Sequence, residues 1–240
     1  NIFNLQDHAE PVLHYWNKVN LFSKTRAVNR FKGFFEVCRY IDKHFIPVDG
    51  LEAYEHFLNS GGKLSNEGIR QAYQSAGHPI FALAEQWSIN VNKTIASIPL
   101  EDRIPFPHVY ESIETVYAVA DIAVVSSANN AAVTAEWEQA GLTKFVNGIF
   151  TQENGSKKQI LASLKQTGGY KDGCILKLGD APGDLQAAQS NAVSFYPIIP
   201  EKEAESWFEF KDTYLPLFIN GQYAECEQQL IDRFYSELED

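Results

Sequence analysis

Apolar positions along the first hundred residues recur every three or four residues, which is the spacing of one face of an α-helix. Ser65 indicates a helix start, and Gly77 followed by Pro79 indicates the end of one helix and the beginning of the next. We find no convincing strand pattern among them, so the sequence predicts helices throughout residues 8–104. The clearest apolar stripe lies within residues 27–45 and consists of Val28, Phe31, Phe35, Cys38 and Ile41.

The pattern changes after Pro105-Phe106-Pro107, which we interpret as a stiff hinge. Short apolar runs now alternate with helical segments, and this alternation is typical of βα units in a parallel sheet. The sequence therefore predicts an α/β fold with a helical region over 1–105 and an α/β region over 106–240, whose last part forms two helices around Gly221. The expected strands are 122–125, 145–150, 174–178 and 193–196, and the expected helices between them are 109–120, 131–140, 156–165 and 185–190.

Composition narrows the class of protein. A net charge of -11 disfavours nucleic acid or an anionic membrane as a general partner, and no apolar stretch approaches the ~20 residues of a membrane span. We expect no secretion signal, because no basic, apolar leader opens the given sequence. The three cysteines are odd in number and far apart, so we expect reduced thiols in the cytoplasm. The sequence gives no indication of the oligomeric state.

Polar residues follow two of the expected strands, where ligands sit in parallel sheets. Asp180 and Asp184 stand four residues apart on a glycine-containing turn after the run 174–178. Two carboxylates that converge there suit Mg²⁺, which takes few protein carboxylates and completes its shell with water and phosphate. The alternative is that Asp184 caps a helix and Asp180 is a turn residue.

Ser126 and Ser127 come directly after the run 122–125, with Asn129 just beyond. A hydroxyl at that position, with the free N–H groups of the next helical turn, could seat a phosphate, although helix capping explains the same residues. Lys157 lies in the first turn of a predicted helix, where a cation is unfavourable with the helix dipole. It either has an anionic partner, such as Asp180 or a phosphate, or is a solvated surface lysine.

The helical region offers a second set of candidate substrate-binding residues. Lys24, Arg26 and Arg30 cluster between two apolar helical segments. Arginine suits oxyanion recognition because its guanidinium presents a planar fork of donors. Solvated loop charges are the alternative interpretation.

In order and spacing, three of these features resemble the haloacid dehalogenase-like (HAD) superfamily. Ser126 matches its second motif, Lys157 its third, and Gly179, Asp180 and Asp184 its Gly-Asp-x-x-x-Asp fourth motif. The resemblance covers residues 106–200 and implies Mg²⁺-dependent phosphoryl transfer. Ser126 would hold the phosphoryl group, Lys157 would neutralise charge, and the two aspartates would hold the metal. The fold implied is a Rossmann-like core with an all-helical cap, which is the region before Pro105.

The family's first motif, an Asp-x-Asp after the central strand, has no counterpart in this sequence. Its first aspartate is the nucleophile, and covalent catalysis of this kind divides one hard displacement into two easier steps. Asn4 and Gln6 imitate the pair, but an amide is a poor nucleophile and three residues are too few for a central strand. The chain also begins with Asn1 and contains no methionine. We expect the first strand and its motif to lie upstream, in which case some other segment fills the central slot or the sheet is open.

Together these features predict a HAD-like hydrolase, and more specifically a phosphatase acting on a small phosphorylated metabolite. The alternative is a catalytically inactive relative that binds a ligand or partner without turnover. Because the nucleophile motif is absent, we expect the 240-residue chain itself to show little turnover.

Overall fold

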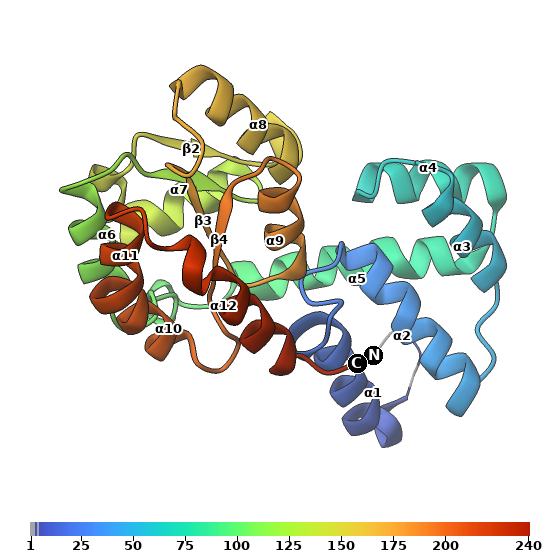
Figure 1. Ribbon diagram of the computed structural model, residues 1–240. Helices are drawn as coiled ribbons and strands as arrows, with labels where there is room; N and C mark the ends of the chain where they lie inside the picture. The colour runs from blue at the N-terminus through green and yellow to red at the C-terminus, as the bar shows by residue number, and fades with distance from the viewer. Residues whose placement is uncertain (1–2, 4) are drawn as a thin grey trace. The chain divides into compact units, whose positions relative to one another are not determined.

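The computed structural model describes Phe3 and residues 5–240, and for Leu100 the backbone alone (Figure 1). Asn4, which imitates one aspartate of the missing motif, lies outside the described residues. The chain divides into two compact units. The helical unit comprises residues 1–98 with Glu239 and Asp240, and the α/β unit comprises Pro99–Leu238. The division falls before the Pro105 stretch, which belongs to the α/β unit.

The described residues of the helical unit form helices joined by short loops. Its last two residues join it because Glu239 pairs with Ser23 in a short parallel bridge, where the Glu239 N–H donates to the Phe22 carbonyl at 2.7 Å. Gly77 adopts a left-handed conformation that ends one helix, and Pro79 begins the next, as the sequence predicted. The helices are α1 (Ala9–Asn17), α2 (Arg30–His44), α3 (Leu51–Asn59), α4 (Asn66–Ala76) and α5 (Pro79–Ala96), with shorter turns at Gln6–His8 and Lys18–Phe22.

One continuous aromatic core holds the helical unit together. Four residues of the predicted stripe, Phe31, Phe35, Cys38 and Ile41, are buried on α2 and pack against side chains from α3, α4 and α5. The fifth, Val28, precedes α2 and is half-buried. Tyr54 lies at the centre, fully buried among the rings of Phe34, Phe35, Phe57 and Phe81. Aromatic burial of this extent dominates the stability of a small helical unit, because each ring removes a large apolar area from water.

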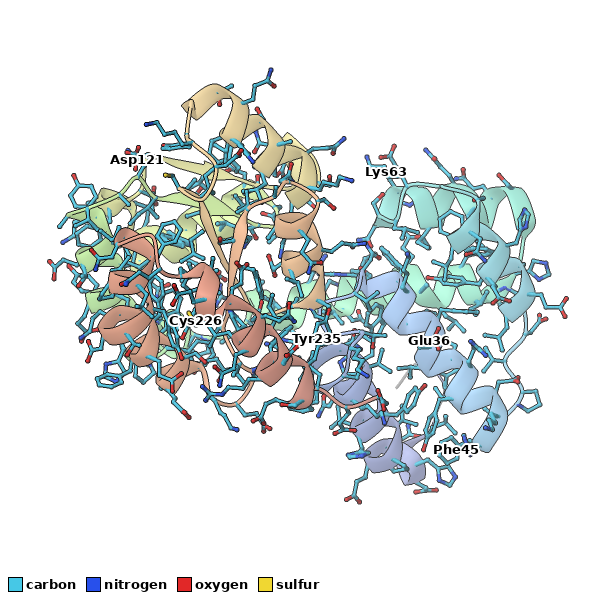
Figure 2. All side chains as sticks on the ribbon, in the orientation of Figure 1. Glu36, Phe45, Lys63, Asp121, Cys226 and Tyr235 are labelled. Atoms are coloured by element: carbon cyan, nitrogen blue, oxygen red, sulfur yellow. The ribbon has the colours of Figure 1, made fainter. Side chains whose placement is uncertain are left out.

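The α/β unit alternates strands and helices as its sequence predicted, with boundaries shifted by a few residues. Figure 2 shows the side chains on this framework, including Asp121, which accepts a hydrogen bond from the Tyr170 hydroxyl at 2.7 Å just before the first strand. The strands are β1 (Ala123–Val125), β2 (Gly148–Phe150), β3 (Leu176–Gly179) and β4 (Ser194–Pro197). The helices are α6 (Val109–Tyr117), α7 (Asn130–Gln139), α8 (Lys157–Gly168), α9 (Pro182–Gln189), α10 (Glu203–Glu209), α11 (Leu215–Ile219) and α12 (Ala224–Ser236). Shorter turns lie at Leu100–Asp102, Thr143–Phe145, Gln152–Asn154 and Phe210–Tyr214.

The strands form two parallel pairs. β1 pairs with β2 in the register Ala123 to Gly148, and β3 pairs with β4 in the register Leu176 to Ser194. Among the described residues the two pairs share no strand pairing. α8 packs against β1 and α9, while α9 packs against β3 and β4 (Figure 1). Within the described residues, one edge of β1 and one edge of β3 therefore have no neighbouring strand.

The outer edge of β4 is capped by side chains from α12 and the residue before it. The Phe195 N–H donates to Glu227 Oε1 at 2.7 Å, and the Phe195 carbonyl accepts from the Tyr223 hydroxyl at 2.7 Å. Exposed strand edges can pair with other chains, and capping both backbone groups blocks that route. On β3, the Leu178 carbonyl accepts a bond of 2.6 Å from the ammonium of Lys177.

Candidate active site

The turn between β3 and α9 carries the two predicted aspartates. β3 ends at Gly179, Asp180 follows half-buried, and Pro182 begins α9. Asp184 lies in the first helical turn, where Ala181 is the N-cap residue, so Asp184 is not the helix cap that the alternative interpretation proposed. A Cβ on Gly179 would lie 2.3 Å from the Cβ of Asp184, a distance that real Cβ atoms essentially never show. Only glycine fits there, because the backbone of β3 lies directly against the Asp184 side chain.

Asp184 binds two lysines with one oxygen. Its Oδ1 lies 2.8 Å from Nζ of Lys157 and 2.9 Å from Nζ of Lys177. The Asp184 side chain is 2% exposed, against 23% for Lys157 and 14% for Lys177. Lys157 is the first residue of α8 and Lys177 lies on β3, so this ion-pair cluster ties α8, β3 and α9 together at the carboxyl end of β3. Lys157 therefore has the anionic partner that its position in the first helical turn indicated.

Burial and charge act against each other in this cluster. Burial alone would raise the pKa of Asp184, but the ammonium groups of Lys177 and Lys157 outweigh it and hold that pKa below its ordinary value of 3.8. Burial lowers the pKa of Lys177, partly opposed by the attraction of Asp184 and, more weakly, of Asp180. A buried charge is tolerated when it is paired and hydrogen-bonded, and Asp184 meets both conditions.

The loops after β1 and β2 are tied to each other. The Gln152 N–H donates to the Ala128 carbonyl at 3.2 Å, and the Asn130 N–H donates to Glu153 Oε1 at 3.3 Å. Ser126 directly follows β1; its N–H donates to the Phe150 carbonyl at 2.9 Å, and its half-buried hydroxyl accepts from the Ala128 N–H at 3.1 Å. Because both strands run parallel, Ser126 lies at the carboxyl edge of its strand pair, as Asp180 does in the other pair.

Two further predicted substrate residues in this loop have different surroundings. Asn129 is the N-cap of α7, where its Oδ1 accepts from the Ala132 N–H at 2.9 Å. Ser127 is exposed. The side chain of Asn129 thus has a structural task, and the roles of both residues in substrate binding stay predictions.

The basic cluster of the helical unit bonds within that unit. Lys24 pairs with Asp240, and Arg26 donates to the Leu21 carbonyl at 2.5 Å. Arg30 donates to Ser88 Oγ at 3.2 Å and to Asn92 Oδ1 at 2.6 Å. These three residues belong to the helical unit and the lysines and aspartates belong to the α/β unit, so their contact with substrate stays a prediction.

The carboxylates at the end of β3 fit Mg²⁺ in part. Across the described part of the chain, no three His, Cys, Asp or Glu side chains form a metal-binding group. Mg²⁺ needs only one or two protein carboxylates, however, when water and phosphate fill its other positions. Asp184 does not suit this role, because its Oδ1 already binds two ammonium groups. Asp180, half-buried at the end of β3, is the carboxylate whose place suits a metal ligand.

Sequence reasoning missed Lys177 and Thr151. The sequence interpretation treated Lys177 as part of an apolar strand. Its charge within that apolar run was the one signal that could have identified it as a functional residue. Thr151 follows β2, is fully buried, and donates its hydroxyl to Glu153 Oε2 at 2.6 Å. It helps to fix the loop that leads to α8, and therefore to Lys157.

Comparison with known proteins agrees with the order of these features. The family model for haloacid dehalogenase-like hydrolases matches residues 27–198, well over half of the chain, from the helical unit to the end of β4. A search of curated proteins finds no match. Within the described residues, no helix has the length and apolar character needed to span a membrane. The chain belongs to the haloacid dehalogenase-like hydrolase family, whose α/β fold its parallel strands and intervening helices share.

Proposed function

We propose that this protein is a Mg²⁺-dependent phosphatase of its family, acting on a small phosphorylated metabolite in the cytoplasm. The observation that carries the proposal is the cluster in which Asp184 binds Lys157 and Lys177 beside Asp180, at the carboxyl end of β3. Ammonium groups at this edge favour an anionic substrate group, and the neighbouring carboxylate favours a divalent cation. Phosphate esters bound with Mg²⁺ supply both.

In this proposal each residue has a distinct task. Ser126 and the N–H groups of the turn after β1 bind the phosphoryl oxygens, and Lys157 neutralises their charge. Asp180 holds Mg²⁺, which when bound supplies Lewis-acid stabilisation of the phosphoryl group. Asp184 positions Lys157 instead of binding the metal. The helical unit is the cap that selects the substrate, with Lys24, Arg26 and Arg30 as its candidate contacts.

The proposed reaction needs a nucleophilic aspartate in an Asp-x-Asp motif, which the given sequence lacks. No Asp-x-Asp occurs anywhere in the 240 residues. We place the strand that carries this motif between β1 and β3, because each of these strands has one edge without a strand partner among the described residues. Parallel sheets are normally continuous and buried on both faces, so two separate two-stranded parallel pairs are unusual in a fold of this type. The absent motif is also what favours the second candidate function, a relative that binds phosphate compounds without turnover.

The test is a phosphate-ester panel assayed with Mg²⁺. The 240-residue chain should show little turnover, whereas any longer form that the gene encodes with an apolar strand and Asp-x-Asp upstream should hydrolyse at least one ester. Asp180→Asn in that active form should abolish the Mg²⁺-dependent rate. Equal activity with and without Asp180→Asn would exclude the proposed metal role. Turnover by the 240-residue chain, lost in Asp180→Asn, would show that the missing motif is dispensable.

A further inference from the structure

At the carboxyl end of β3, the single positive charge of Lys157 does not balance the negative charges around it. Two carboxylates, Asp180 and Asp184, lie at this turn, and a phosphoryl group would add further negative charge. In the absence of Mg²⁺, Lys157 by itself would leave more negative than positive charge at this turn, and the turn would repel a phosphate group. Lys177 corrects the balance, because its ammonium lies 2.9 Å from the same Asp184 oxygen that Lys157 binds.

The hydrogen bonds of Lys177 leave it able to bind a further acceptor. An ammonium has three N–H donors. In the described part of the chain, Lys177 directs one to the Leu178 carbonyl at 2.6 Å and one to Asp184 Oδ1 at 2.9 Å. Lys157 directs one to Asp184. Both lysines thus share one hydrogen-bonded carboxylate, Asp184, and retain donor capacity, which is the arrangement expected of a site that receives an anion.

We propose that Lys177 is a second phosphate-binding cation, held beside Lys157 by their common carboxylate Asp184. This inference rests on the proposed function, since it assigns a further binding residue to the same site. It gives Asp184 the role of a positioning residue for two cations. The competing account is that Lys177 only supports the fold by satisfying the Leu178 carbonyl and the buried Asp184.

The experiment measures inorganic phosphate binding to the 240-residue chain by titration calorimetry at several ionic strengths. The variants are Lys157→Met, Lys177→Met and Lys177→Arg. Lys211→Met is the matched control, because the Lys211 side chain is 26% exposed, against 23% for Lys157, lies in the same unit and pairs with one neighbouring carboxylate, Asp212, at 3.3 Å. Circular dichroism checks that each variant folds.

We expect each methionine variant at the site to weaken phosphate binding by roughly tenfold or more, as loss of a charged hydrogen bond does. Lys177→Arg should restore most of the affinity because it keeps the charge. The salt dependence should also become shallower in Lys177→Met, an effect that a purely structural lysine would not produce. Lys211→Met should bind like the wild type.

The possible failures are distinguishable. If the wild type binds no phosphate, the proposed function and this inference both fall. If Lys157→Met weakens binding but Lys177→Met binds like the wild type, only the role of Lys177 falls. Equal weakening by Lys177→Met and Lys211→Met would indicate a general charge effect and overturn the inference. If Lys177→Met does not fold, Lys177→Gln replaces it, and wild-type affinity in that variant overturns the inference.

Discussion

One buried polar side chain in each unit of this chain shows two opposite solutions to burial. In the α/β unit, the buried carboxylate of Asp184 binds two ammonium groups. In the helical unit, the buried hydroxyl of Tyr54 has no hydrogen-bond partner in the described part of the chain. Burying a polar group costs free energy unless it is hydrogen-bonded. The helical unit bears this cost within a large aromatic core, whereas the α/β unit builds its polar edge around compensating charges.

The apolar cores of the two units also differ, because one is continuous and the other is divided. The helical unit has one continuous cluster of buried apolar residues centred on α2. The buried apolar residues of the α/β unit fall into several smaller clusters, and its strands fall into two pairs. A continuous core stabilises a fold by itself, but a divided one relies more on specific polar contacts. The polar contacts of the α/β unit should therefore matter more to stability than those of the helical unit.

The largest expected effect is the loss of Asp184. Asp184→Ala leaves two ammonium groups without their common carboxylate, and removing one partner of a buried ion pair typically costs about 3–5 kcal/mol. Urea unfolding, followed by a probe in the α/β unit such as Trp137 or Trp207, measures the change. Asp172→Ala is the control, because Asp172 pairs with Lys165 but its side chain is 90% exposed, and it should unfold nearly as the wild type does.

The same substitution gives a pH dependence. The folded pKa of Asp184 lies below its ordinary value of 3.8, so its ionised form contributes stability above that value. This contribution is lost as the pH falls through the folded pKa. The difference in unfolding free energy between wild type and Asp184→Ala should therefore be full at pH 7 and shrink below pH 3.8. A difference that does not change with pH would show that the carboxylate acts through packing, not charge.

The next effect concerns the turn that brings Asp184 to the lysines. Gly179→Ala places a Cβ 2.3 Å from the Asp184 Cβ, and overpacking of this kind costs up to about 3 kcal/mol. It should also disturb the pairing of Asp184 with Lys177. Urea unfolding measures the cost, and Gly183→Ala is the control, because a Cβ there meets no atom within 4 Å. Equal stability of the two variants would mean that β3 can shift away from α9 at little cost.

Much of this fold was accessible from the sequence because its signals are local. Ser65, Gly77 and Pro79 occupy the helix ends that they predicted, because capping and proline geometry depend on neighbouring residues alone. The strands were also found in order, because short apolar runs between helices mark βα units. Their ends shifted by one to three residues, since β3 includes Gly179 and β2 begins at Gly148 instead of residue 145.

The parts that sequence could not predict depend on long-range contacts. The pairing of Lys157 with Asp184 spans 27 residues, and the sequence offered Asp180 or a phosphate as partner instead. Lys177 passed as a strand residue, because the pattern of an apolar run does not say where one charged side chain in it will lie. Asn129 was predicted to contact substrate, and the structure shows that its side chain also caps α7. Capping and ligand binding use the same residue types at the same places, so the sequence alone does not separate them.

A smaller effect concerns the outer edge of β4. Glu227→Ala removes the acceptor for the buried Phe195 N–H, and an unsatisfied buried donor costs about 1–2 kcal/mol. Hydrogen exchange of the Phe195 amide should quicken in this variant. Glu225→Ala is the control, since it lies in the same first turn of α12 and shares the favourable effect of the helix dipole. Unchanged protection of the Phe195 amide would show that its burial, without the bond to Glu227, is enough to slow exchange.

The smallest effect tests the comparison most directly, because one substitution should have opposite signs in the two units. Tyr54→Phe removes a hydroxyl that has no partner among the described residues, so it should leave the helical unit as stable as the wild type or up to about 1 kcal/mol more stable. Tyr196→Phe removes a buried hydroxyl that donates to the Ser206 carbonyl at 2.7 Å, so it should destabilise the α/β unit by about 1 kcal/mol. Urea unfolding of both variants, read by tryptophans of the unit concerned, gives the two values. A loss of stability in Tyr54→Phe equal to that in Tyr196→Phe would mean that the Tyr54 hydroxyl is satisfied in solution, for example by a buried water. The contrast between the units would then rest on their charges alone.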